Sequence, residues 1–148
     1  MQVLLDALLE GAHDPVLEGI EVVVQPALST SGEDVLSAAG YILGTTANFG
    51  YMSGALKHFF DSTFMAIGGS LSDDGSAAGS SGVTAGRPFG LYVHGRYDTT
   101  GAVRSVLGIV GALRWRQSAD VLEVLGAVTQ NDLDAAYNLG ATLAAGLT

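Results

Sequence analysis

The sequence predicts an α/β fold in which an open parallel sheet is covered by helices on both faces, giving three layers. Two patterns carry this prediction. Helix-like and strand-like segments alternate along the chain, and the strand-like segments are continuous apolar runs. Such runs are typical of strands buried on both faces, because crossover helices cover each side of a parallel sheet. The 148 residues suffice for one large core, so a single domain spanning residues 1–148 is expected.

The first part of the chain contains two predicted helices and two predicted strands. Residues 1–12 place leucines on one helical face. Residues 20–27, IEVVVQPA, have the composition of a buried strand that ends at its proline. Residues 29–39 begin with hydroxyl side chains followed by two acidic ones, which favours a short capped helix. Residues 40–44, GYILG, are the second predicted strand.

The rest of the chain continues the alternation of helix and strand. A helix with its large apolar side chains on one face is predicted first, and two further strands are each followed by a helix. Thr129 or Asn131 is expected to cap the last of these helices. The predicted elements are helix 52–67, strand 87–96, helix 100–113, strand 121–128 and helix 129–147.

Residues 68–86 form a segment rich in glycine, serine and alanine, which has few side chains able to pack. This composition predicts a long mobile loop. Two roles are open for it. An insertion without chemical consequence is favoured, and a lid over an active site is the alternative.

Composition and charge exclude several classes of protein. The net charge of −9 opposes binding to nucleic acid, and no apolar run has the roughly 18 residues of a membrane span. The absence of cysteine removes disulfides and thiolate nucleophiles. The N-terminal segment has no basic region and includes two acidic residues, so it does not resemble a signal peptide. The sequence therefore predicts a compact soluble protein with a cytoplasmic location.

The segment GYILGTTANFGYMSGALKHFFDSTF, residues 40–64, joins a strand to a helix through a small polar loop. Ligands of open α/β sheets bind at the carboxyl ends of strands, where backbone N–H groups lack partners. Phe49 and Tyr51 offer aromatic surfaces for a flat ring. Gly50 is expected to serve a turn beside that ring, where a Cβ has no room and positive φ is needed. A flavin fits this combination.

Two loops resemble those of a known family. The segment from Gly44 is similar to the flavin loop of the flavodoxin-like NAD(P)H-dependent FMN oxidoreductases, especially the tryptophan-repressor-binding-protein type of quinone reductase. HGRYDTT, residues 94–100, resembles that family's next flavin-contacting loop. The resemblance extends over the whole chain. The matching positions of the first loop are Gly44, Thr45, Phe49, Gly50, Met52, Ser53, Leu56 and Asp61.

The resemblance implies a flavodoxin-like fold that binds FMN and takes NAD(P)H as co-substrate. Electrons would pass to a quinone or a similar small-molecule acceptor, and assembly into a homo-oligomer is left open. One loop would lie along the isoalloxazine ring and ribityl chain, and the other would border the opposite side of the ring. The cofactor-binding residues implied are Thr45, Thr46, Ala47, Asn48, Phe49, Gly50, His94, Gly95, Arg96, Tyr97 and Asp98.

The chain departs from the family in two places. Thr46, Ala47 and Asn48 stand where the family has proline, threonine and often arginine. The family also begins with a central strand and a phosphate-binding loop, whereas this chain begins within the following helix. Met1 is then either an internal methionine or the start of a domain without this cradle. The first alternative is favoured, and it predicts roughly 10 to 15 further upstream residues and tighter FMN binding by the longer chain.

Several residues have a structural alternative to a flavin role. His94 is either a ring contact or a hydrogen-bonded histidine at a strand end, and Asp98 is either a site residue or a helix cap. Arg96 is the best candidate to offset a phosphate. Lys57 and Asp61 are expected to form a surface pair.

No acid, base and nucleophile occur at catalytic spacing, so no residue is predicted to be catalytic and no metal site is expected. That pattern is typical of a flavoprotein, in which the cofactor carries the hydride chemistry. The other function class left open is a flavodoxin-like domain without cofactor that acts as a structural or interaction module.

Overall fold

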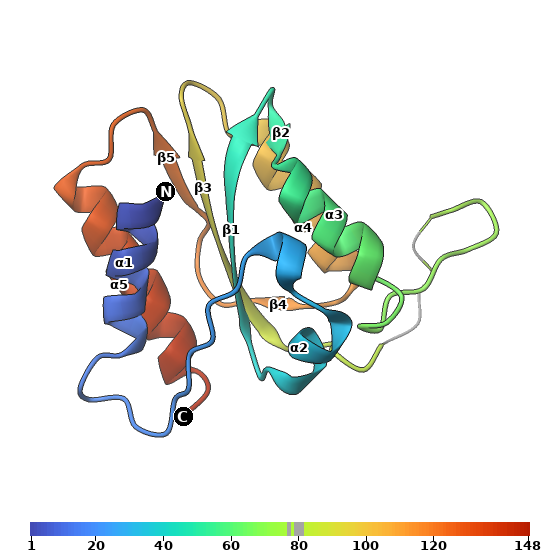
Figure 1. Ribbon diagram of the computed structural model, residues 1–148, viewed down its shortest axis with the longest axis horizontal. Coiled ribbons are helices and arrows are strands. Elements are labelled where there is room, and N and C mark those ends of the chain that lie inside the picture. Colours follow the sequence, from blue (N-terminus) through green and yellow to red (C-terminus); the bar gives the residue numbers. More distant parts are fainter. Residues whose placement is uncertain (77, 79–81) are drawn as a thin grey trace.

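The computed structural model describes residues 1–76, 78 and 82–148. Figure 1 shows a central sheet with α1 and α5 on one face and α3 and α4 on the other. The predicted three-layer α/β fold is therefore confirmed. The elements are α1 (Gln2–Ala12), the 3-10 helix η1 (Ala27–Ser29), α2 (Gly32–Ser37), β1 (Tyr41–Asn48), β2 (Tyr51–Met52), α3 (Gly54–Thr63), β3 (Pro88–Gly95), α4 (Thr100–Ala112), β4 (Arg116–Gln117), β5 (Leu122–Leu125) and α5 (Gln130–Ala145).

Strand β3 is the centre of the sheet. It pairs along its length with β1 in parallel, in a register that sets Tyr41 beside Phe89 and Thr46 beside His94. On its other edge β3 pairs in parallel first with β4 and then with β5. Among the described strands of this sheet, β2 alone is antiparallel, as the second half of a hairpin with β1. The carboxyl ends of β1, β3 and β5 therefore meet at one end of the sheet.

The apolar side chains form two clusters, one on each face of the sheet. The larger cluster joins α3, α4, β1 and β3 and includes Phe60 and Val106, while the smaller one joins α1, α5, β3 and β5 through Leu4 and Leu139. The predicted helical faces are thus the buried ones. No helix in the described residues is long and apolar enough to cross a membrane.

The predicted strand at residues 20–27 is wrong. The segment is extended but unpaired among the described residues, and Figure 1 draws it without an arrow between α1 and η1. Val23 and Val24 are 68% and 53% exposed. A strand forms only where a neighbour accepts its backbone hydrogen bonds, and none of the described strands pairs with this segment. Apolar composition without a neighbour did not produce a strand.

Several other boundaries also differ from the predictions, including the end of α3 at Thr63 and both ends of α2. β1 continues to Asn48, so residues 45–48 are strand rather than loop, because residues 45–46 pair with β3 and β2 folds back to pair with residues 47–48. α3 begins at Gly54, since the Ser53 hydroxyl accepts the Leu56 N–H at 3.2 Å. β5 covers only Leu122–Leu125 of the predicted strand.

The helix caps follow the sequence signals. Ser31 and Asp34 form a reciprocal capping box at the start of α2. Thr129 does the same with Asp132 at the start of α5, which selects Thr129 over Asn131 as the cap. Hydrogen bonds from Thr129, first from its backbone N–H and then from its hydroxyl, lower the pKa of the Asp132 carboxyl.

The Gly/Ser-rich segment is anchored at its end by a buried residue. Thr84 is fully buried, donates its hydroxyl proton to the Ile67 carbonyl at 2.6 Å and accepts the indole N–H of Trp115 at 2.8 Å. The segment therefore contributes a side chain to the core, contrary to its composition. The part of the predicted mobile loop at residues 77 and 79–81 lies outside the described residues.

Replacing Thr84 with valine is expected to lower the free energy of unfolding by about 2 kcal/mol, because the buried N–H of Trp115 loses its acceptor while the side-chain shape is kept. Urea denaturation followed by Trp115 fluorescence measures this change. Thr84→Ser retains the hydroxyl and is the control. Equal stabilities for the valine and serine variants would show that the hydrogen bond contributes nothing.

Candidate functional site

Three loops lie together at the carboxyl end of the sheet, as Figure 1 shows at the top of its view. They are the β1–β2 turn, the β3–α4 loop at residues 96–99 and the β5–α5 loop at residues 126–129. The β1–β3 register places Thr46 directly beside His94. The structure therefore brings together the two predicted loops, which are distant in sequence.

Thr45 is a structural residue of the turn. Its side chain is 2% exposed, its hydroxyl oxygen accepts the Ser53 N–H at 2.9 Å, and its hydroxyl proton is donated to the Thr46 carbonyl at 2.9 Å. Both functions of the hydroxyl are used. Thr45 thus fixes the start of α3 against β1, and its side chain is buried rather than open to a ligand.

The β1–β2 turn holds an aromatic residue in a rare backbone conformation. Asn48 pairs with Tyr51, so Phe49 and Gly50 form a two-residue turn, with φ of 51° and 72°. Such turns favour Asn-Gly, because most side chains are strained at positive φ. The Phe49 side chain is fully exposed. The chain therefore holds an apolar ring in water on a strained residue, a combination that is found more often at functional sites than elsewhere.

Of the two reasons predicted for a glycine at residue 50, positive φ is confirmed and lack of space for a Cβ is not. The φ of Gly50 is positive, as expected, but a Cβ at Gly50 would meet no atom within 4 Å. The turn is held from behind instead, by the first turn of α4. A Cβ on Gly101 would lie 1.8 Å from the carbonyl oxygen of Gly50. The absence of a side chain at residue 101 lets α4 approach the turn and fix its position.

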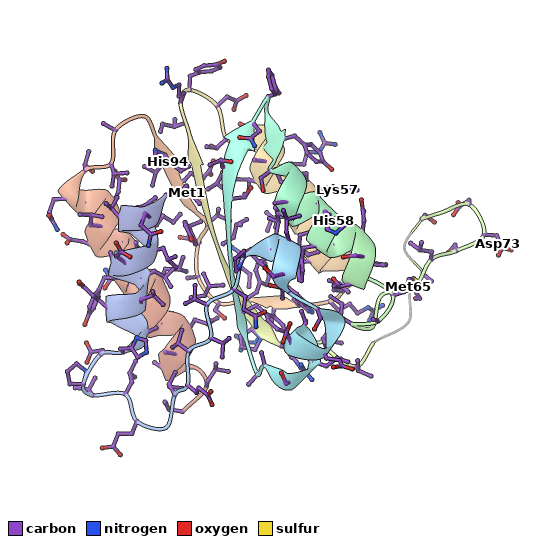
Figure 2. The ribbon with its side chains drawn as sticks, in the orientation of Figure 1. Met1, Lys57, His58, Met65, Asp73 and His94 are labelled. Atoms are coloured by element: carbon purple, nitrogen blue, oxygen red, sulfur yellow. The ribbon has the colours of Figure 1, made fainter. Side chains whose placement is uncertain are left out.

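His94 joins the other two loops. Its Nε2 lies 2.6 Å from the carbonyl oxygen of Gly126, so this nitrogen donates the hydrogen bond. Its Nδ1 lies 3.4 Å from the backbone nitrogen of Met1, and Figure 2 shows the two residues at the same end of the molecule. His94 is therefore a half-buried, hydrogen-bonded histidine that connects β3, β5 and the start of α1.

The rest of the second predicted loop divides into structural and exposed residues. Gly95 is buried, while Arg96 and Tyr97 are exposed, Tyr97 by 88%. Asp98 accepts the Thr100 N–H at 3.0 Å, and this bond lowers the pKa of its carboxyl. Asp98 therefore serves the start of α4, as its structural alternative predicted. Arg96 and Tyr97 are the side chains left to meet a ligand.

The remaining residues of the first loop lie along the end of β1. Ala47 is half-buried and packs on the core below α4, while Thr46 is half-buried and Asn48 is exposed. Tyr51 does not join Phe49 at the end of the sheet and instead lines a groove between α3 and α4. Lys57 and Asp61 form the expected surface pair, with the ammonium nitrogen 2.6 Å from a carboxylate oxygen.

The sequence did not predict that the third loop and the start of α1 contact the second loop. Gly126, with φ of 72°, turns the chain at the end of β5 and presents its carbonyl to His94. Thr99 donates to the Glu123 carboxylate at 2.5 Å and ties the base of the second loop to β5. A glycine directly after the strand-like residues LEVL was the available signal. Within the described residues, no group of three His, Asp or Glu side chains is placed to hold a metal ion.

Comparisons with solved structures identify the fold. No protein-family model and no curated protein sequence matches the chain. A flavodoxin from the domain Archaea superposes with a TM-score of 0.76 at 15% identity, covering 99% of this chain and 89% of that one. Flavodoxin 1 from Bacillus cereus gives a TM-score of 0.75 at 16% identity, covering 99% and 90%. A flavodoxin described as WrbA-like, from Agrobacterium tumefaciens, gives 0.69 at 15% identity, covering 98% and 87%. The fold is therefore flavodoxin-like.

Proposed function

We propose that this flavodoxin-like chain binds FMN at the carboxyl end of its sheet and passes electrons from NAD(P)H to a quinone or a similar acceptor. The observation that carries the proposal is Phe49, a fully exposed ring held at positive φ where strands β1 and β3 end. A strained and exposed aromatic residue gains from a flat partner that covers it.

The residues present fit the two parts of the cofactor. Phe49 and Tyr97 supply exposed aromatic surfaces from two neighbouring loops, which suits the isoalloxazine ring. Arg96 supplies an exposed cation beside Tyr97, which suits the phosphate. The start of α1 lies against His94, and its first amide N–H groups have no side-chain cap.

When bound, FMN supplies the hydride and electron chemistry, which the protein side chains lack. The protein's part is to orient and hold. Thr45 and Gly101 fix the turn that carries Phe49, and His94 holds the β5 loop to the start of α1. Because Phe49 and Tyr97 are open to water, the site suits an acceptor that arrives from solution.

The second candidate function is a flavodoxin-like domain without cofactor, kept as a structural or interaction module. The Thr45 hydroxyl favours this reading, because its hydrogen bonds inside the turn are already complete. The positions of the surface grooves also favour a domain without cofactor. One described groove lies between α1 and α5 and another between α3 and α4, and neither is lined by Phe49 or by the β3–α4 and β5–α5 loops.

The flavin proposal is tested with FMN and riboflavin, which differ only in the phosphate. Arg96→Gln is expected to weaken FMN about fivefold and to leave riboflavin unchanged, because an exposed ion pair is worth about 1 kcal/mol. Flavin fluorescence quenching measures both affinities. Arg116→Gln removes an exposed cation from β4 and is the control.

Two results would count against the proposal. Absence of saturable FMN binding to the wild-type chain favours the cofactor-free module. Equal losses for FMN and riboflavin in Arg96→Gln would show that Arg96 does not meet the phosphate. Oxidation of NADH or NADPH by the loaded protein, with a quinone as acceptor, then tests the electron-transfer part.

A further inference from the structure

A groove of about 680 Å³ runs between α3 and α4, on the face of the sheet opposite α1 and α5. It begins at Tyr51 and Gly101, just behind the β1–β2 turn, and reaches Leu71 beyond the end of α3. Its volume lies within the roughly 300 to 1,000 Å³ of small-molecule sites.

The groove is lined by aromatic residues and by small residues of α4. Tyr51 and Phe64 stand on the α3 side, and Tyr51 is 43% exposed. On the α4 side, Gly108 and Ala112 present little beyond backbone, and a Cβ at Gly108 would meet no atom within 4 Å. A groove lined by aromatic rings and by small residues of a helix suits a flat apolar group.

The charge around the groove differs from that of the rest of the protein. The chain has fifteen acidic residues and six cations, yet two of the six cations, Lys57 and Arg104, line this groove beside one acid, Asp61. Lys57 is paired with Asp61, and Figure 2 shows it on α3 with Met65 beyond the helix end. Arg104 is exposed and makes no hydrogen bond or ion pair within the described part of the chain.

We propose that this groove is a second binding site, which takes an aromatic anion. The flat ring would lie in the groove over the Gly108 surface, with its carboxylate, sulfonate or phosphate paired to Arg104. Charge complementarity favours this occupant, because a free guanidinium at the edge of an apolar groove in an acidic protein selects for a negative group on an apolar ring. The proposal does not depend on flavin binding at the sheet end.

The probe for the test is 8-anilinonaphthalene-1-sulfonate, an aromatic anion whose fluorescence rises in apolar surroundings. Gly108→Leu fills the groove and is expected to abolish saturable binding. Arg104→Gln is expected to weaken it about fivefold, as for other exposed ion pairs. Each variant has a matched control outside the groove. Gly111→Leu adds the same side chain to α4, where a Cβ also meets no atom within 4 Å, and Arg116→Gln removes a cation from β4.

Unchanged probe affinity in Gly108→Leu and Arg104→Gln would overturn the proposal, as would equal losses in the two controls. Sedimentation of the wild-type and Gly108→Leu proteins tests whether a second copy of the chain occupies the groove instead. A wild-type dimer that becomes a monomer in Gly108→Leu would show that a second copy fills the groove. Gly108→Leu and Arg104→Gln are expected to leave FMN affinity unchanged, so that failure here and failure of the flavin proposal are separate results.

Discussion

Replacing Gly140 with alanine is expected to lower the free energy of unfolding by about 3 kcal/mol, because the new methyl group has no space between two helices. A Cβ on Gly140 of α5 would lie 2.0 Å from the carbonyl oxygen of Leu8 in α1. The contact is reciprocal, since a Cβ on Gly11 would lie 1.9 Å from the carbonyl oxygen of Tyr137. Backbone cannot rotate away as a side chain can, so the helices must separate.

Separation of α1 from α5 would disturb more than one contact. Leu4 and Leu8 are buried in the cluster that α1 and α5 share with β3 and β5. A shift of α1 would also move Met1 away from His94. We therefore expect Gly140→Ala to loosen both the packing on this face and the start of α1 at the candidate site.

Thermal and urea denaturation measure the change in stability. Gly111→Ala is the matched control, because Gly111 is an exposed glycine in α4 whose Cβ would meet no atom within 4 Å. That variant is expected to gain up to about 1 kcal/mol from helix propensity. A Gly140→Ala protein as stable as the wild type would show that α1 and α5 are not held at this distance in solution.

The sequence was sufficient to predict the layers because they depend on local signals. Ser31 and Thr129 each begin a helix through a capping box that can be read directly from neighbouring residues. The apolar run of β3 is buried almost throughout, as a strand covered by helices on both faces should be. Hydrophobic periodicity and capping residues involve neighbouring positions of the chain, so they can be recognised in a single sequence.

Pairing between strands cannot be predicted from local signals, because it depends on residues that are distant in sequence. Residues 20–27 have strand composition, yet remain unpaired because a strand also needs a neighbour. The reverse holds for residues 45–48, whose small polar side chains predicted a loop but which pair with β3 and β2. The two candidate loops were identified, whereas the Gly126 loop was missed because its role is a carbonyl offered to a distant histidine.

Phe49→Asn is expected to change stability and flavin affinity in opposite directions. Asparagine tolerates positive φ and is favoured before glycine in a two-residue turn, so relief of strain should raise the free energy of unfolding by about 1 kcal/mol. Phe49 is fully exposed, so the substitution removes no packing from the core. Gly50→Val acts in the opposite sense, because valine at a φ of 72° strains the turn and should lower stability.

The second part of this prediction concerns flavin affinity. Loss of the Phe49 ring should weaken FMN by about 2 kcal/mol, roughly thirtyfold in Kd, which is the usual worth of one aromatic stacking partner. Phe49→Ala separates the two effects, since it removes the ring without asparagine's preference for positive φ. FMN titration and thermal denaturation of both variants provide the measurement. If Phe49→Asn gains stability while FMN affinity stays at the wild-type value in both variants, the ring has no ligand to meet, and the strained turn is not part of a flavin site.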